Sequence, residues 1–545
     1  GGGIDSPRPA SQRAAAFILT AAMLTTFTAP AFAKTWYIEN GDITVKAGEA
    51  EGPNKVKQGD SDFVKDEGDT IITGTSDKNT VTIEAENKND TVEVTLKDVN
   101  IDASSRNEAA VSVTGSGNTT IKLDGDNHLT GGISDNGSYG LSGISSSGSL
   151  TISGGETDSL TAQGGSGTDG SGGRGIFSKD LTISGGTVNA NGGDGKNGSG
   201  GSGITSLGSL TISGGTVNAA GGDGTNSSDG GDGITNNRGV TISSGGTVTA
   251  KGGSGEDGSG GRGISSFGGV TISSGGTVTA TGGNSTGSDG SGGDGISSTS
   301  TTISGGTVTA DGGSGNFSGG NGIRSFDVAI SGGTVNVAGG NGGNGSGSDV
   351  GNGIYSSDID LSGSLELTAK AGSPNGKALS RVGHEFDLNA IKDKLGPGAK
   401  VTVTDADGKV NQVSIPRPVE PEGPVIPEDS SSSSGGGSAT SSAPASPLPG
   451  LTVTDKDGQR ISYTSTQSGN TLTVCVGRFT ASFRISLAAL RQLRAEGIET
   501  ITFQTILCST TLSLDELLAM GGEDAEVVLT HHIRSSTLTV GGKAV

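Results

Sequence analysis

The chain has 545 residues, of which 104 are glycine and only 3% are aromatic, and it carries a formal net charge of −22. This composition excludes an ordinary globular enzyme with a bulky core but suits a narrow repeat structure lined by Ile, Leu, Val and Ala. Its acidity and lack of basic clusters argue against nucleic acid or anionic lipid as a partner and favour divalent cations.

The N-terminus has the pattern of a secretory signal peptide. Arg8 and Arg13 flank the start of an apolar run from Ala14 to Phe27, and Ala31-Phe32-Ala33 supplies a small-residue cleavage site. We therefore expect residues 1–33 to be removed and the mature protein to be secreted, or held at the surface of a bacterium, without membrane insertion. A membrane anchor is the alternative, but the run is short for a bilayer span.

A phrase of about 30 residues then repeats through the middle of the chain. Each unit contains Gly-Ile, then Leu-Thr-Ile-Ser-Gly-Gly or a close variant, then Thr-Val-x-Ala, and a long Gly/Ser/Asp/Asn loop. The Gly-Ile isoleucines lie 27 (323 minus 296) to 32 (296 minus 264) residues apart: Ile176, Ile204, Ile234, Ile264, Ile296, Ile323 and Ile354. A flexible linker has no reason to keep this interval, whereas a solenoid requires it.

The short apolar segments of the repeat predict strands rather than helices. Leu-Thr-Ile-Ser and Thr-Val-x-Ala alternate apolar with small polar residues, which places their side chains on opposite faces of a strand. Three such strands in each unit of about 30 residues describe one coil of a right-handed parallel β-helix. The sequence therefore predicts an all-β solenoid in which each position of the phrase forms a column along the rod.

Earlier strands keep the register of the phrase, so we assign residues 34–379 to the β-helix, with Trp36 and Tyr37 covering its N-terminal end. These strands are predicted at Thr80–Ala85, Thr91–Leu96, Val99–Ala103, Val111–Val113 and Ile121–Leu123. Residues 380–414 are expected to form a C-terminal cap. It would contain a short helix over Phe386–Leu395 and a hairpin of Lys400–Thr404 with Val410–Ser414.

A Pro/Ser/Gly linker, residues 415–450, precedes a small α+β module, residues 451–545. Its expected strands are Thr471–Val476, Thr480–Ile485, Thr500–Thr505, Ala525–His531 and Thr537–Val540, and its expected helices are Leu487–Ala495 and Leu514–Met520. Ser513 and Glu516 fit a capping box at the second helix. Cys475 and Cys508 either pair in the extracellular space or remain buried thiols, and no motif makes either one catalytic.

One column of short oxygen-bearing side chains follows the Gly-Gly pair of each loop, and a second lies three positions further along. Stacked in register, such oxygens on glycine-rich turns suit Ca²⁺. The alternative is that Asp, Asn and Ser are turn formers, with Asn side chains bonding one another along the rod. The candidate calcium ligands are Asp169, Asp194, Asn197, Asp223, Asn226, Asp257 and Asp289.

Another column precedes each Gly-Ile and alternates in charge: Arg174, Ser202, Asp232, Arg262, Asp294, Asn321 and Asn352. A ladder of vertically neighbouring charges explains this column. The candidate ligand-binding residues of the loop face are Asp194, Asp223, Asp232, Arg262 and Asp294. A sharper interpretation makes Arg262 a catalytic base. Tryptophan platforms for stacking sugars are missing, so a glycan would be held by hydrogen bonds, carboxylates and calcium, with minor help from Tyr139 or Tyr355.

Several stretches resemble the clostridial carbohydrate-binding β-helix family. They are the run Thr91–Ile101, the beat Ala109–Val111, the segment Ile121–Thr130 and the repeated phrase, and the resemblance covers about Thr70 to Leu379. It implies a right-handed β-helix like that of polysaccharide lyases, bound calcium, and affinity for acidic or cellulosic plant polysaccharide without catalysis. The longer, more glycine-rich loops of this chain depart from the family.

Three functions follow. The first is a secreted, non-catalytic, calcium-stabilised rod that binds polysaccharide. The second is a Ca²⁺-dependent polysaccharide lyase that uses Arg262 or Arg174. The third is a structural surface protein or adhesin whose rod projects the C-terminal module, through which it would associate with the cell surface.

Overall fold

A computed structural model describes residues 34–418 and 448–545, apart from Ser244, Asn344, Ser346, Ser348, Glu523 and Arg534. The expected signal peptide and most of the expected linker lie outside the described residues. The chain divides into two compact units between Arg417 and Pro418. We call residues 34–417 the rod and residues 448–545 the C-terminal module, and each is described by itself.

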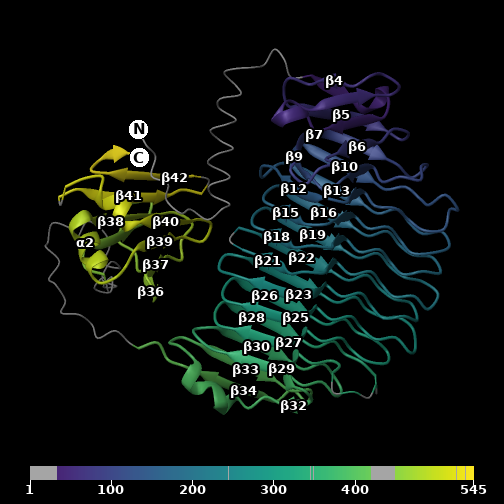
Figure 1. Cartoon of the computed structure of the whole chain (residues 1–545). Helices are drawn as coiled ribbons and strands as arrows, with labels where there is room; N and C mark the ends of the chain where they lie inside the picture. The colour runs from purple at the N-terminus through teal and green to yellow at the C-terminus, as the bar shows by residue number, and fades with distance from the viewer. Residues whose placement is uncertain are drawn as a thin grey trace. The chain divides into compact units, whose positions relative to one another are not determined.

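The rod is a parallel β-solenoid of about 13 turns, as the repeat predicted. One coil consists of β14 (Ile176–Ser178), β15 (Leu181–Ile183) and β16 (Thr187–Asn191). Each of these strands pairs in parallel with its equivalent in the next coil, with Ile176 opposite Ile204 and Val188 opposite Val217. Figure 1 shows these strands stacked side by side along the rod.

Strands in equivalent positions form three ladders. The first ladder contains β2 (Ile43–Lys46), β6 (Val81–Glu84), β8 (Val111–Thr114), β11 (Ile144–Ser146), β14, β17 (Ile204–Ser206), β20 (Ile234–Asn236), β23 (Ile264–Ile272), β25 (Ile296–Ile303), β27 (Ile323–Ile330), β29 (Ile354–Leu361) and β31 (Leu379–Arg381). The second contains β9 (Asn118–Asp124), β12 (Ser149–Ser153), β15, β18 (Leu210–Ile212), β21 (Val240–Ile242) and the second halves of β23, β25, β27 and β29. The third contains β10 (Asp126–Thr130), β13 (Ser159–Gln163), β16, β19 (Thr216–Ala220), β22 (Thr247–Lys251), β24 (Thr277–Thr281), β26 (Thr307–Asp311), β28 (Thr334–Ala338), β30 (Glu366–Lys370) and β33 (Lys400–Thr404).

The alternating pattern of the phrase explains the core. Ile183, Val188 and Ala190 point inward and are fully buried, whereas the intervening Thr187 and Asn189 lie on the outer face. Stacking repeats this arrangement in every coil, so that one continuous apolar column fills the rod. No single coil could bury these side chains alone, which is why the fold needs the repeat.

Both ends of the rod are closed by antiparallel strands. At the N-terminal end, β3 (Lys55–Gln58) pairs antiparallel with β2, and β4 (Val64–Lys65) pairs antiparallel with β3. The strand β1 (Thr35–Tyr37) pairs in parallel with β5 (Thr70–Ser76), which pairs in parallel with β7 (Thr91–Asp102). The 3₁₀ turn η1 (Ile38–Asn40) connects β1 to β2, and η2 (Glu49–Glu51) lies between β2 and β3. Trp36 is buried there, and its indole N–H donates to Oδ2 of Asp66 at 3.0 Å. Closure by antiparallel strands protects an open edge from pairing with other chains.

The C-terminal end contains β32 (His384–Glu385), η3 (Leu388–Lys394) and β34 (Val410–Ser414). The predicted hairpin is confirmed, since β33 and β34 pair antiparallel. The predicted helix is shorter than expected and is a 3₁₀ helix, whose first turn is capped by the Asp387 carboxylate accepting from the Asn389 N–H at 2.9 Å.

The C-terminal module has its own hydrophobic core around Phe483 and Phe503, whose ring centroids lie 4.5 Å apart. One sheet contains β35 (Leu451–Thr454), β38 (Ala481–Ser486), β41 (Glu526–His531), β42 (Ser536–Val540) and β43 (Lys543–Ala544), and the other β36 (Thr464–Ser468), β37 (Thr471–Cys475), β39 (Thr500–Gln504) and β40 (Ser509–Ser513). The helices are α2 (Leu487–Ala495) and α3 (Leu514–Leu518).

Most of the predicted elements of this module are confirmed, and β35, β36, β40 and β43 were missed. The Ser513 hydroxyl caps α3 by accepting from the Glu516 N–H at 3.4 Å. The reciprocal half of the capping box is not satisfied by Oε2 of Glu516, which is buried without a hydrogen bond among the described residues. Cys475 and Cys508 do not form a disulfide with each other.

Candidate functional site

The long loops of the rod are a hydrogen-bonded lattice of glycine pairs. Each loop leaves the third strand through one Gly-Gly pair and returns through another, as in Gly192-Gly193 and Gly200-Gly201. The Gly201 N–H donates to the Gly193 carbonyl, and the Gly222 N–H of the next coil donates to the Gly201 carbonyl, both at 2.8 Å. A Cβ added at Gly192 or at Gly200 would lie 1.8 Å from a backbone oxygen. Close backbone approach therefore requires glycine here.

The column after the outgoing glycine pair lies in the predicted register. Asp194 accepts from the backbone N–H of Asp223 at 2.8 Å, and Asp223 in turn accepts from the N–H of Ser254 at 2.9 Å. Two coils further on, Asn284 accepts from the N–H of Ser314 at 2.9 Å. Each side chain thus satisfies a backbone donor of the following coil, and this accounts for the recurrence of Asp and Asn at this position.

The column at the loop tips begins as an amide ladder. Oδ1 of Asp169 accepts from the Asn197 amide at 3.0 Å, and the Asn197 side-chain oxygen accepts from the Asn226 amide. Asn197 and Asn226 both have positive φ, 54° and 56°, a conformation that asparagine tolerates better than most residues. Asp257 and Asp289 lie exposed in later tips.

These contacts match the Asn-stack interpretation of the oxygen columns. Within residues 34–418 and 448–545, leaving aside the six positions not described, no three His, Cys, Asp or Glu side chains lie close enough together to bind one metal ion. The acidic donors are instead spread one to a coil along each column. In this arrangement they do not make a closed cage for Ca²⁺, and calcium binding stays a prediction.

The column that precedes each Gly-Ile strand is also in register. Oδ1 of Asp232 accepts from the backbone N–H of Arg262 at 2.8 Å, and Oδ1 of Asp294 accepts from the N–H of Asn321 at 2.8 Å. The Arg262 guanidinium donates to Ser265 at 3.4 Å and forms no ion pair with the described carboxylates. Burial raises the pKa of Asp232 and of Asp294, against the opposing effect of nearby arginines.

Two cavities lie in tandem along this column. The first has a volume of about 760 Å³ and is lined by Glu108, Tyr139, Asp169, Arg174, Phe177 and Ser202, among others. The second, about 310 Å³, is lined by Asp232, Arg262, Asp294, Asn321, Arg324 and Asp349. Three predicted binding residues, Asp232, Arg262 and Asp294, therefore line one cavity. Asp194 and Asp223 belong to the neighbouring column and line neither cavity.

Each cavity is lined by an arginine that lies against an aromatic ring. The Arg174 guanidinium carbon lies 5.0 Å from the ring centroid of Phe177, and that of Arg324 lies 5.8 Å from the ring centroid of Tyr355. Between Phe177 and Arg324 in the same column, the strands present hydroxyl side chains: Thr205, Thr235, Ser265 and Ser297.

The two arginines differ in their partners. Arg324 forms an ion pair with Asp349 at 3.2 Å. Arg174 forms no ion pair within the described part of the chain, and partial burial lowers its pKa. A desolvated guanidinium without a carboxylate is the group in this face that an anionic ligand would stabilise most.

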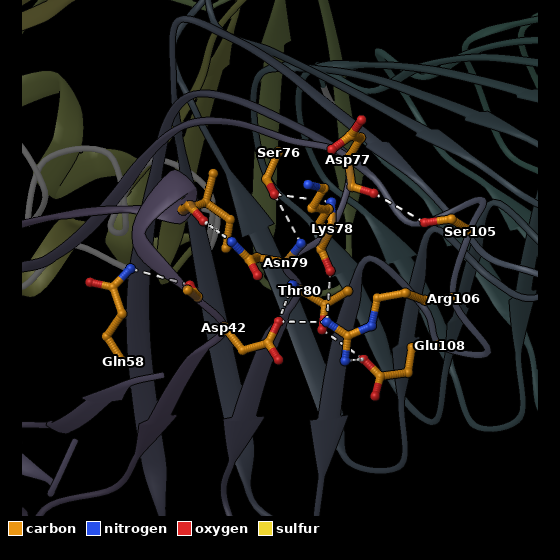
Figure 2. A network of polar contacts seen from close by, with 12 residues as sticks. Asp42, Gln58, Ser76, Asp77, Lys78, Asn79, Thr80, Ser105, Arg106 and Glu108 are labelled. Carbon is orange, nitrogen blue, oxygen red and sulfur yellow. Dashed lines mark hydrogen bonds and ion pairs between the residues drawn. The ribbon is translucent and has the colours of Figure 1, made fainter. Parts of the chain in front are cut away.

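A charge network at the N-terminal end shows the contrasting case. Arg106 contacts Asp42 at 2.6 Å and Glu108 at 3.0 Å, and the Thr80 hydroxyl donates to Glu108 at 2.7 Å. Figure 2 shows these side chains converging. Because Asp42 and Glu108 both pair with Arg106, the charge of this guanidinium is neutralised within the protein, and its contacts connect three coils.

The sequence missed Phe177, Glu108 and Arg324 as members of this face. A signal was present, because Phe177, Arg324 and Tyr355 each directly follow the isoleucine of a Gly-Ile strand. No protein-family model, no curated protein and no solved structure matches the chain. Among the described residues, no helix is both long enough and apolar enough to cross a bilayer.

Proposed function

We propose that this protein is a secreted, non-catalytic rod that binds a linear acidic polysaccharide along the two tandem cavities. The observation that carries the proposal is Arg174, an arginine held against Phe177 over the larger cavity with no carboxylate partner among the described residues. A uronate carboxylate would supply that partner through a two-pronged, charge-assisted hydrogen bond.

The repeat of the rod supports a polymeric ligand. Successive coils lie about 4.8 Å apart, so the same hydroxyl, carboxylate and guanidinium groups recur along a straight line. Sugar hydroxyls would donate to Asp232 and Asp294 and accept from Ser202. The face of a pyranose ring would lie against Tyr139, which is 50% exposed at the first cavity.

The chemistry of the second cavity supports binding rather than bond cleavage. A guanidinium is a planar cation with several donors and no acceptor, which makes Arg262 a better ligand for an anion than a base. Its backbone N–H is already bonded to Asp232. Arg262 would accordingly orient a sugar carboxylate or hydroxyl.

Calcium would bridge the carboxylates of the rod and those of the glycan. The rod carries many carboxylates on its loop face, and an acidic glycan carries more, so a hard divalent cation shared between the two would offset their repulsion. Residues Asp169, Asp257 and Asp289 at the loop tips are the donors for such a shared ion. Secretion rests on the signal-like N-terminus alone.

The test uses the purified full-length protein and polygalacturonate, with a neutral glucan as the comparison. Retention on polygalacturonate without an increase in unsaturated-product absorbance is expected, and a chelator should weaken it. Growing absorbance would establish the lyase instead. Retention on the neutral glucan alone would refute recognition through Arg174, and no retention on either would favour the structural or adhesin function.

A further inference from the structure

The first of the two cavities on the loop face offers a ligand one free positive charge. Arg174 lines it without an ion pair to any residue that the structure describes. Of the two carboxylates in its lining, Glu108 is already paired with Arg106 at 3.0 Å, and Asp169 accepts from the Asn197 amide at 3.0 Å. An anionic group entering this cavity would therefore meet Arg174.

The second cavity has the opposite character. Its lining contains four aspartates and two arginines, of which Arg324 and Asp349 pair with each other at 3.2 Å. The other charged groups of the lining are one guanidinium and three carboxylates: Arg262, Asp229, Asp232 and Asp294. One positive charge thus stands against three negative charges, and an anionic group entering this cavity would be repelled.

The carboxylates of the second cavity are held in place as hydrogen-bond acceptors. Oδ1 of Asp229 accepts from the Ser259 N–H at 2.8 Å, and Oδ2 of Asp232 accepts from the Thr235 hydroxyl at 2.9 Å. Asp229 is exposed, and Asp232 and Asp294 are half-buried. Because an ionised carboxylate has about four acceptor positions, each one keeps lone pairs for a ligand. Positioned anionic acceptors of this kind suit the hydroxyl groups of an uncharged sugar.

We propose that the second cavity selects sugars without a carboxylate, so that the ligand is an acidic heteropolysaccharide with uncharged sugars beside its uronates. A uronate in this cavity would bring its carboxylate among Asp229, Asp232 and Asp294, and juxtaposed like charges exclude a partner. An uncharged sugar would donate its hydroxyls to these carboxylates and accept from Arg262.

The register of the coils sets how closely the two kinds of sugar follow each other. The Gly175 N–H donates to the Ser202 carbonyl and the Gly203 N–H to the Asp232 carbonyl, so Arg174 lies two coils before Asp232. Two coils correspond to about 10 Å along the rod. A uronate at Arg174 and an uncharged sugar at Asp232 would therefore belong to one short stretch of chain. The inference rests on the proposed glycan binding and adds which class of acidic glycan is bound.

Polygalacturonate whose carboxylates are reduced to alcohols in graded degree tests the proposal, because the backbone stays the same while the charge falls. Affinity for the full-length protein, measured by titration calorimetry at neutral pH and at one calcium concentration and ionic strength, should pass through a maximum at an intermediate degree of reduction. A continuous fall from the unreduced polymer onward would overturn the inference, since charge density alone would then explain binding. No binding to any member of the series would refute the proposed function as well.

Substitutions in the second cavity test which side chains exclude the uronate. Asp232→Asn and Asp294→Asn each keep an oxygen for the backbone N–H of the following coil but remove a negative charge. Each should raise affinity for unreduced polygalacturonate several-fold and move the maximum toward the unreduced polymer. The matched control Asp327→Asn removes an exposed carboxylate outside both cavities and should leave the maximum in place. Equal effects of all three changes, or no effect of the two cavity variants when their unfolding midpoints match the wild type, would overturn the inference.

Discussion

The guanidinium carbon of Arg174 lies 5.0 Å from the ring centroid of Phe177, three residues further along the same coil. Stacking fixes the direction of the guanidinium without consuming its hydrogen-bond donors. The arrangement leaves a positioned cation beside a cavity of about 760 Å³. This pair thus places a positive charge on a loop face that otherwise carries many carboxylates.

Replacing Arg174 should therefore weaken acidic-glycan binding selectively. Arg174→Gln removes a charge-assisted hydrogen bond worth about 1.5–3 kcal/mol, so affinity for polygalacturonate should fall about ten- to a hundredfold by titration calorimetry. Arg324→Gln is the matched control and should have a smaller effect, because Asp349 already neutralises that guanidinium. Equal losses in both variants would contradict a special role for Arg174.

Asp194 separates the ladder interpretation from calcium binding. Asp194→Asn keeps an oxygen that can accept from the Asp223 N–H, so the ladder predicts a midpoint of unfolding close to that of the wild type without calcium. Asp194→Ala leaves that donor unpaired and should cost about 1–3 kcal/mol. If Asp194 also binds Ca²⁺, both variants should lose a calcium-dependent rise in the midpoint that the wild type shows, and the Asn variant should lose it without being destabilised in the absence of calcium. Denaturant titrations with and without calcium measure both effects.

The glycine lattice predicts a sharp positional difference between two alanine substitutions. Gly192→Ala would bring a methyl group to within 1.8 Å of the Gly201 oxygen, so the backbone legs must separate. Overpacking of this kind typically costs about 1–3 kcal/mol. Gly170→Ala, at a loop tip where the nearest atom lies 3.3 Å from the added carbon, requires only a small local shift and should cost much less stability. Hydrogen exchange of the neighbouring coils would detect the local loss, and comparable effects of the two changes would argue against the lattice.

The C-terminal module should lose stability in mild acid because of His531. Its ring is buried between the hydroxyls of Thr505 at 3.1 Å and Thr510 at 2.9 Å, and burial, aided by His532, lowers its pKa to about 4. The folded state thus binds its proton less readily than the unfolded state, whose pKa is near 6.5. The contribution of neutral His531 to the free energy of unfolding is therefore complete above pH 6.5. It is lost progressively as the pH falls toward 4, and the total loss is about 3 kcal/mol.

Hydrogen exchange in β38 and β41 as a function of pH measures this loss. His531→Gln should flatten the pH dependence between 6.5 and 4, even if it lowers stability at every pH. His532→Gln, on an exposed neighbour, should leave the profile nearly unchanged. A profile unaltered by His531→Gln would assign the acid sensitivity to other groups.

Much of the rod follows from its sequence because the decisive signal is local and repeated. The spacing of Ile176, Ile204 and Ile234 fixes the coil, and aligning the loops gives the correct column neighbours for Asp194 and Asp232. The partners that the side chains of those columns bind could not be predicted in the same way. Whether Asp194 meets a cation or the N–H of Asp223 depends on how backbone donors point between coils.

The missed elements have equally specific reasons. β36, Thr464–Ser468, has no buried face and therefore no apolar alternation to detect. The stacking of Arg174 on Phe177 joins two columns that sequence alignment treats separately.

The glycine lattice has a consequence for how such a rod changes length. Each loop leg bonds to the other leg of its own coil and to the coils directly above and below it, and tips of different size, between Gly193 and Gly200 or between Gly283 and Gly292, are carried by legs with the same bonds. A coil is consequently a repeating unit whose tip can change in length while its legs keep the same bonds. Duplication or deletion of whole coils would lengthen or shorten the molecule while preserving the chemistry of every remaining level.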